Sequence, residues 1–317
     1  MTKKLTGIAR LIWGANLLGL LALGIFLSAS GFFSAPALSA PQETTPRPRK
    51  TARPSRTPFP NVTLRPSLTP WPTPSLGPSV TPMAVSANRQ IIGYTTENRP
   101  LEVYRYGGGL NVKLIVAGIH GGYEHNTVEL AAELMAYLND NPQLVPADTS
   151  LYILPNLNPD GYARVKGVEG RANANNVDLN RNWPYNWQKD WRRDGCWLFT
   201  PIEGGAAAAS EPEVQALIAF VDLIRPQALI SYHSAALGIF SGGRPDFPES
   251  MRLAEDIAAV SDYPYPPIDT GCDYTGNLTD WAANTRGIPA VDIELTNHSD
   301  TDFAQNLRVL QVFLAWR

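Results

Sequence analysis

Residues 111–125 read NVKLIVAGIHGGYEH, and this stretch decides the fold. Its first nine residues are almost all apolar, as expected of a β-strand that is buried on both faces of a parallel sheet. His120 follows the strand and is itself followed by two glycines. Binding sites in such sheets gather at the carboxyl ends of the strands. The stretch therefore predicts a buried strand that carries His120 to a site at the edge of the sheet.

Strands and helices alternate along the rest of this region. Short apolar runs are followed by longer segments in which apolar residues recur at helical spacing. Further strands are expected at 151–155, 228–232 and 290–295, and helices at 127–139, in a run ending near 224, and at 248–261, 278–285 and 302–316. Gly287 is placed to end the helix at 278–285. The pattern predicts an α/β fold with a mixed, mostly parallel central sheet and helices on both faces.

Residues 1–40 have the composition of a segment that enters or crosses a membrane. Lys3, Lys4 and Arg10 accompany an almost wholly apolar run from 11 to 33, and a helix needs about 20 such residues to span a bilayer core. A cleaved signal peptide and a retained membrane anchor both fit this pattern. In either case the basic residues stay on the cytoplasmic side. The rest of the chain is expected outside the cytoplasm, either anchored to the membrane or secreted.

Residues 41–83 form a Pro/Ser/Thr-rich linker that precedes a folded domain at 84–317. Twelve of the 28 prolines fall in the linker, which has too few large apolar residues to form a core and is expected to be disordered. The domain after it holds 17 basic and 28 acidic residues, a balance that speaks against nucleic-acid binding. Cys196 and Cys272 are the only cysteines, and whether they form a disulfide stays open.

Three residues with metal or acid–base chemistry follow or end expected strands. His120 follows the first strand, His233 follows the strand at 228–232, and Glu294 lies near the end of the last one. Two imidazoles and one carboxylate are a sufficient ligand set for catalytic zinc. The parallel arrangement would bring these strand ends to one edge of the sheet.

Several separated motifs give the domain a resemblance to a known family. They are Asn158-Pro159-Asp160-Gly161-Tyr162, Gly170-Arg171, Val177-Asp178-Leu179-Asn180-Arg181-Asn182-Trp183, Tyr232-His233-Ser234, Asp280-Trp281 and Ile293-Glu294-Leu295. In this order and spacing the chain resembles the zinc metallocarboxypeptidases, which include carboxypeptidases A, B and E and their bacterial relatives. The resemblance runs from His120 to about Thr296 and covers nearly the whole domain.

The resemblance implies a metal site with one zinc ion per chain. His120, Glu124 and His233 would be its ligands. Asp178 would accept a hydrogen bond from the far nitrogen of His120 and so fix the tautomer of that ring. Glu294 would be the catalytic base, which takes a proton from the attacking water and returns it to the leaving amine.

The resemblance also implies how a substrate is held. Asn180 and Arg181 would bind the terminal carboxylate of a peptide, and Arg171 would stabilise the developing oxyanion. The expected partner is therefore a peptide with a free C-terminal carboxylate, bound by a monomer. The membrane is a further partner if the N-terminal helix is uncleaved.

The sequence departs from the family pattern at two places. Three residues separate His120 from Glu124, one more than usual, so His125 and Glu129 compete as ligands. The family tyrosine eight residues before Asp280-Trp281 is replaced by Cys272, and Tyr274 is the candidate to reach the substrate from another backbone path.

Substrate specificity and reaction class leave alternatives open. Thr279, Arg244 and Asp246 are candidates for the wall of the side-chain pocket. Besides a carboxypeptidase, the sequence fits a murein-peptide (diamino acid) hydrolase of the same fold, an aspartoacylase-like deacylase of small molecules, or a binding module without activity. The Asn158–Tyr162 block and the interval to Glu294 favour a peptidase, and the retained chemical residues speak against an inactive binding module.

Overall fold

The structure is a computed structural model, and it describes residues 88–190, 203–235 and 237–317. The expected N-terminal helix and linker, residues 1–83, and Cys196 lie outside the described residues. Within the described part of the chain, no helix combines the length and apolar character needed to cross a membrane.

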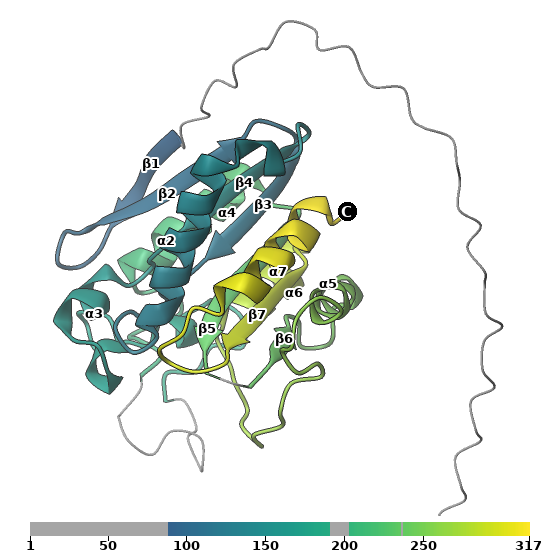
Figure 1. Ribbon diagram of the computed structural model, residues 1–317. Coiled ribbons are helices and arrows are strands. Elements are labelled where there is room, and N and C mark those ends of the chain that lie inside the picture. Colours follow the sequence, from purple (N-terminus) through teal and green to yellow (C-terminus); the bar gives the residue numbers. More distant parts are fainter. Residues whose placement is uncertain (1–87, 191–202, 236) are drawn as a thin grey trace, which may run out of the picture. The chain divides into compact units, whose positions relative to one another are not determined.

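Seven strands form one mixed sheet in the order β1-β2-β4-β3-β5-β7-β6 (Figure 1). The strands are β1 (Asn88–Tyr94), β2 (Pro100–Gly107), β3 (Asn111–Val116), β4 (Thr149–Leu154), β5 (Ala228–Ser234), β6 (Ile239–Ser241) and β7 (Ala290–Leu295). The four central strands, β4, β3, β5 and β7, run parallel, while β1, β2 and β6 pair antiparallel at the two sides. The predicted mixed sheet is confirmed, and its parallel part is the centre.

Helices cover both faces of this sheet, as the sequence predicts. They are α2 (His125–Asp140), α3 (Pro159–Arg164), α4 (Pro212–Ile224), α5 (Pro248–Ala258), α6 (Leu278–Arg286) and α7 (Phe303–Ala315), with short 3-10 turns at Pro142–Leu144, Val168–Gly170 and Leu179–Arg181. Side chains of α2, α5 and α7 pack into one apolar core on one face, and those of α4 and α6 pack into a second core on the other. Figure 1 shows α2 and α7 side by side across the near face.

Local sequence explains how the helices next to the strand ends begin and stop. Asn277 caps α6 because its side chain accepts a hydrogen bond of 2.7 Å from the backbone NH of Asp280. Gly287, in the left-handed conformation with φ 64°, ends the same helix, as predicted. Asn158 caps α3 in the same way through the NH of Gly161, at 2.8 Å. These caps fix the loops that surround the carboxyl ends of the parallel strands.

Candidate metal centre and active site

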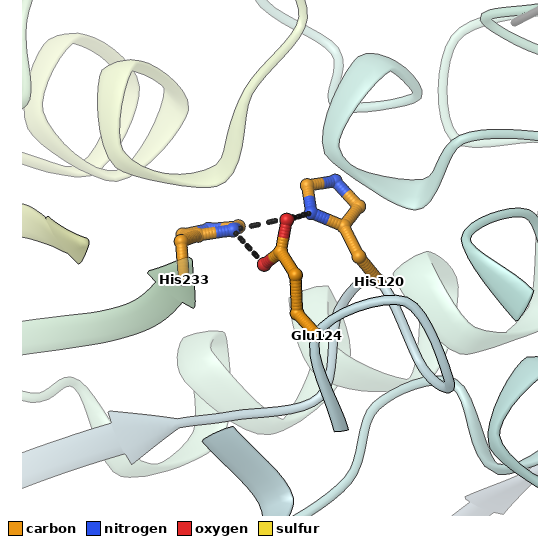
Figure 2. Close-up of side chains that lie close together, drawn as sticks. All are labelled: His120, Glu124 and His233. Carbon is orange, nitrogen blue, oxygen red and sulfur yellow. Dashed lines mark hydrogen bonds and ion pairs between the residues drawn. The ribbon is translucent and has the colours of Figure 1, made fainter. Parts of the chain in front are cut away.

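Three side chains meet at the carboxyl end of the parallel sheet and would hold a metal ion. His120 and Glu124 come from the loop that joins β3 to α2, and His233 comes from the end of β5 (Figure 2). Their donor atoms lie within 4.8 Å of one another, and all three residues are buried. Glu124 lies between the rings, with Oε1 at 2.7 Å from Nδ1 of His120 and Oε2 at 3.1 Å from Nδ1 of His233. The Nδ1 atoms of both rings therefore point at one position.

The extra residue between His120 and Glu124 is absorbed by a tight turn. The NH of Gly121 donates to the carbonyl of Gly118 at 3.0 Å, and Gly121 itself has a φ of 44°, which favours glycine. The competing ligands do not join the cluster: His125 is absent from it, and Glu129 forms an ion pair of 2.7 Å with Lys166 at the surface. Glu124 is thus the carboxylate that the loop delivers to the histidines.

A second group of buried side chains supports His120 from behind. Asp178 Oδ1 lies 3.1 Å from Nε2 of His120, as expected from the resemblance, and its Oδ2 accepts a bond of 2.9 Å from Nε of Arg171. Burial opposes ionisation of Asp178, but the positive charge of Arg171 and the interaction with His120 outweigh it and hold the pKa of Asp178 well below its usual range. The carboxylate is therefore ionised and can hold His120 in the tautomer that leaves Nδ1 free for a metal.

Glu294 reaches the same position from β7. It is the register partner of His233 on the neighbouring parallel strand, so the two side chains leave the sheet side by side. Its Oε2 atom is buried and accepts no hydrogen bond from the described residues. Burial raises the pKa of Glu294 to about 8, and the negative charge of Glu124 adds to this effect. A carboxyl group beside a metal position, with one oxygen left without a partner, is placed where a catalytic base would act.

The ligand set fits zinc. Two imidazole nitrogens and one carboxylate are typical of catalytic zinc sites, which keep a further position open. Glu294 lines the same cleft as these three residues.

Comparison with known proteins decides the family. The model of the family described as zinc carboxypeptidase matches residues 85–311, which is most of the chain. The chain belongs to the zinc carboxypeptidase family. It is accordingly a zinc metallopeptidase, and zinc is the metal that His120, Glu124 and His233 would bind.

Two curated relatives and one solved structure show what this member of the family resembles. It is 28% identical to murein peptide amidase A of Vibrio campbellii over 57% of this chain and 68% of the relative. It is 33% identical to the catalytic chain of human carboxypeptidase N over 40% of this chain and 33% of the relative. The structure of bovine thrombin-activatable fibrinolysis inhibitor, in complex with a tick carboxypeptidase inhibitor, matches with a TM-score of 0.58, 21% identity and coverage of 73% and 88%. The matches thus span about two thirds and one third of the two relatives' lengths.

The remaining expected site residues line one cleft with the metal ligands. This cleft of the carboxypeptidase has a volume of about 380 Å³ and is lined by Asn180, Arg181 and Tyr274 as well as by the triad, Arg171 and Glu294. Arg181 is 4% exposed, and its guanidinium lies 5.1 Å above the ring of Tyr274. The backbone NH of Leu278 donates to Oδ1 of Asn180 at 3.0 Å, and Nδ2 of Asn180 lies 3.4 Å from Nε2 of His233.

Close backbone packing places Arg181. Gly276 has a φ of 64°, and a Cβ atom there would lie 2.6 Å from the carbonyl oxygen of Arg181. Only glycine lets these two segments approach so closely. The loop that carries Tyr274 is thereby held against the 3-10 turn that carries Arg181.

The other pocket candidates divide into two kinds. Thr279 and Arg244 line the cleft, whereas Asp246 is exposed and does not. Cys272 lines the cleft and is disulfide-bonded, and Cys196, the only other cysteine of the chain, lies outside the described residues. Tyr274 is the tyrosine of this loop that reaches the cleft.

The sequence analysis missed several residues that line the cleft, among them Asp292 and His298. Asp292 lies two residues before Glu294 and lines the cleft beside it. His298 follows β7 and packs against Tyr123, with ring centroids 4.5 Å apart and ring planes tilted by 47°. The alternation of side chains along β7 was the available signal for Asp292, because residues two apart face the same side of a strand. His298 lies in a loop, where no periodic pattern points to it.

Proposed function

We propose that this zinc carboxypeptidase releases the C-terminal residue of peptides. The observation that carries the proposal is the buried guanidinium of Arg181, which lines the same cleft as the zinc ligands and Glu294. Nη1 of Arg181 donates to the carbonyl oxygen of Asn180 at 2.6 Å, which fixes one end of the guanidinium. A planar guanidinium binds a carboxylate through two parallel hydrogen bonds. Arg181 and Asn180 would therefore hold the terminal carboxylate and set the cut at the last peptide bond.

The chemistry would then depend on the bound metal and on Glu294, Arg171 and Asp178. Zinc, when bound to the triad, supplies a Lewis acid that polarises the scissile carbonyl and makes water more acidic. Glu294 would take the proton of the attacking water and pass it to the leaving nitrogen. Arg171, which donates to Glu124 at 3.3 Å, would stabilise the negative charge that develops on the carbonyl oxygen. Asp178 would hold both His120 and Arg171 in place for these roles.

Pairs of peptides that differ only at the C-terminus test this proposal. The zinc-loaded protein should hydrolyse a peptide with a free carboxylate and leave the same peptide with a C-terminal amide nearly untouched. Mass spectrometry of the products would show whether one residue is released. Equal cleavage of both peptides, or cleavage away from the end, would overturn the exopeptidase assignment.

A second candidate is hydrolysis of murein peptides next to a diamino acid. The wall of the cleft carries both charge signs: Arg244 is half-exposed there, and its Nε lies 3.4 Å from Oδ2 of Asp280. Such a wall is complementary to a side chain that ends in both a carboxylate and an ammonium group. One curated relative is named murein peptide amidase A, which agrees with this candidate.

The two candidates differ in one measurable ratio. A murein tripeptide ending in a diamino acid and an ordinary tripeptide ending in lysine share a free carboxylate and a side-chain ammonium group. Only the murein peptide adds the second carboxylate at the end of the side chain. A higher kcat/KM for the murein peptide would favour the second candidate, and equal values would favour a general carboxypeptidase. Hydrolysis of an acylated amino acid, in preference to both, would instead indicate a small-molecule deacylase.

We also propose that the enzyme acts outside the cytoplasm as a monomer. The apolar run at 11–33 and the basic residues before it support export, and they leave cleavage or retention of this segment open. Membrane fractionation of cells that express the full chain would distinguish an anchored from a secreted form. Light scattering of the purified protein would measure its mass against the 34.6 kDa of one chain.

A further inference from the structure

We propose that Asp292 is a positioning residue for the zinc ligand His233. It would do for this histidine what Asp178 does for His120. The inference rests on the zinc site and is independent of which peptide the enzyme cuts.

The sheet itself brings the two residues together. β5 and β7 run parallel, and their register pairs Ser231 with Asp292 and His233 with Glu294. Because side chains two residues apart face the same side of a strand, these four form a two-by-two block. His233 and Glu294 form the pair nearer the carboxyl ends of the strands and reach the metal position. Asp292 and Ser231 form the preceding pair on the same face. The neighbourhood of Asp292 is therefore set by strand pairing and does not depend on a loop.

The atoms of His233 divide between the metal position and this block. Its Nδ1 faces the metal position, at 3.1 Å from Glu124 and 3.3 Å from Nδ1 of His120. Its Nε2 faces the other way, at 3.0 Å from Oγ of Ser231 and 3.4 Å from Oδ1 of Asp292. When Nδ1 binds zinc, the ring proton must be on Nε2, which then requires an acceptor.

Asp292 has an oxygen to offer for this bond. Its Oδ1 is buried and accepts no hydrogen bond from the described residues, while its Oδ2 accepts one of 2.7 Å from the hydroxyl of Thr279. Thr279 thus holds one oxygen and leaves the other toward His233. Buried carboxylate oxygens without a donor are costly, so a bond from His233 would satisfy both groups.

Asn180 does not compete for this role. Its Nδ2 lies 3.4 Å from Nε2 of His233, but the NH of Leu278 fixes its oxygen elsewhere, so it presents a donor. Ser231 is nearer than Asp292, but a hydroxyl is neutral. A carboxylate acceptor makes the imidazole a stronger ligand, and loss of such a partner typically weakens metal binding about 10- to 100-fold.

The test measures zinc affinity, not turnover. Zinc dissociation constants of the purified protein would be obtained by competition with a chromophoric chelator in the absence of substrate. We expect Asp292→Ala to raise the constant about 10- to 100-fold and Asp292→Asn, which keeps an acceptor but loses the charge, to raise it less. Ser231→Ala and the isosteric Thr279→Val are matched controls, with expected changes below those of Asp292→Ala. Thermal unfolding of the metal-free variants shows whether each one is folded. If Asp292→Ala does not fold, the zinc affinity of Asp292→Asn decides the test.

A spectroscopic signature separates positioning from mere packing. In the zinc-loaded protein, long-range proton–nitrogen NMR should show His233 with its proton on Nε2, and that signal should shift in Asp292→Asn and shift less in Thr279→Val, which leaves the carboxylate in place. Zinc affinity of both Asp292 variants within twofold of the original would overturn the proposal. So would a loss in Ser231→Ala as large as that in Asp292→Ala. A change confined to kcat/KM for peptides with a basic last residue would mean that Asp292 serves the substrate instead.

Discussion

The charged residues on the zinc side of the cleft are buried, whereas Arg244, on the wall expected to contact the substrate side chain, and its partner Asp273 are exposed. On the zinc side, the side chains of His120, Asp178 and Arg171 are at most 5% exposed, and each is hydrogen-bonded to another of the group. On the wall, Arg244 is 46% exposed and pairs with Asp273, which is 82% exposed. Buried charged networks tolerate few changes, because each loss leaves a partner unsatisfied. Exposed pairs contribute little and can change freely. We therefore expect substitutions on the zinc side to impair the reaction itself, and substitutions on the wall to alter substrate preference.

The largest expected effect comes from Glu294, the proposed base on the zinc side. Glu294→Gln keeps the shape of the side chain but removes the proton acceptor, so we expect kcat to fall by about 100- to 10,000-fold. Zinc content should stay near one ion per chain, because Glu294 is not one of the three ligands. Steady-state kinetics and elemental analysis of the same sample measure both.

A surface carboxylate provides the control for this variant. Glu129 lies on α2 near the ligand loop but pairs with Lys166 at the surface. Glu129→Gln should therefore retain both turnover and zinc. A Glu294→Gln enzyme with unchanged kcat would remove this residue from the mechanism.

The second effect concerns Arg181, which is buried and is proposed to bind the terminal carboxylate of the substrate. Arg181→Ala should lower kcat/KM for free-acid peptides by about 100-fold, since a charge-assisted bond to a buried group contributes roughly 1.5–3 kcal/mol. Amidated peptides should be affected much less, so the ratio between the two should approach one. Arg181→Lys keeps the charge without the planar fork and is expected to fall between the original enzyme and Arg181→Ala. An unchanged ratio in Arg181→Ala would place carboxylate recognition elsewhere in the cleft.

Glu213 is a useful comparison for Asp178, because it is a buried carboxyl group outside the zinc site. It is fully buried on α4, and Nδ2 of Asn173 donates to it at 3.2 Å, but no ion pair with it occurs within the described residues. Burial raises the pKa of Glu213 to about 7, opposite in direction to Asp178. The folded state thus holds this proton more tightly than the unfolded state, and stability falls as pH rises from about 4.5 through 7.

Replacement by glutamine should remove that dependence. We expect Glu213→Gln to match the original protein at pH 5 and to be more stable at pH 8, by about 1–2 kcal/mol out of an upper bound near 3 kcal/mol for the shift. Urea unfolding at both pH values measures the difference. Glu255→Gln, an exposed change on α5, should show no such pH dependence. A Glu213→Gln protein that is less stable at pH 8 would contradict the expected sign.

The parallel centre of the fold could be predicted from the sequence, and its edges could not. The strands β3, β4 and β5 are largely buried and read mostly as apolar runs, while β7 is apolar except for Asp292 and Glu294. The hairpin of β1 and β2 was not predicted, because sequences such as Arg89-Gln90-Ile91 mix polar and apolar residues without a clear period. β6 has three residues, which is too short for any pattern to indicate.

The same division holds within the site. The zinc ligands and Glu294 could be predicted, because strand ends and separated motifs place them. Asp292 was missed, since a single acid within a strand is usually read as facing solvent, although it shares the face of Glu294. The wall around Arg244 depends on loop packing between segments about 30 residues apart, such as its 3.2 Å pair with Asp273. Sequence spacing alone carries no information about such a contact.

The smallest expected effect comes from this wall. Arg244→Gln should lower kcat/KM about 2- to 10-fold for peptides whose last side chain ends in a carboxylate, because half-exposed ion pairs contribute about 1 kcal/mol or less. Peptides ending in alanine should be unaffected, and zinc content should not change. Asp273→Asn is the matched opposite, since it releases Arg244 from its surface partner and should raise kcat/KM for the same acidic substrates. If both variants changed kcat/KM equally for all substrates, Arg244 and Asp273 would affect the reaction itself and not substrate preference. The division between the zinc side and the wall would then not hold for this enzyme.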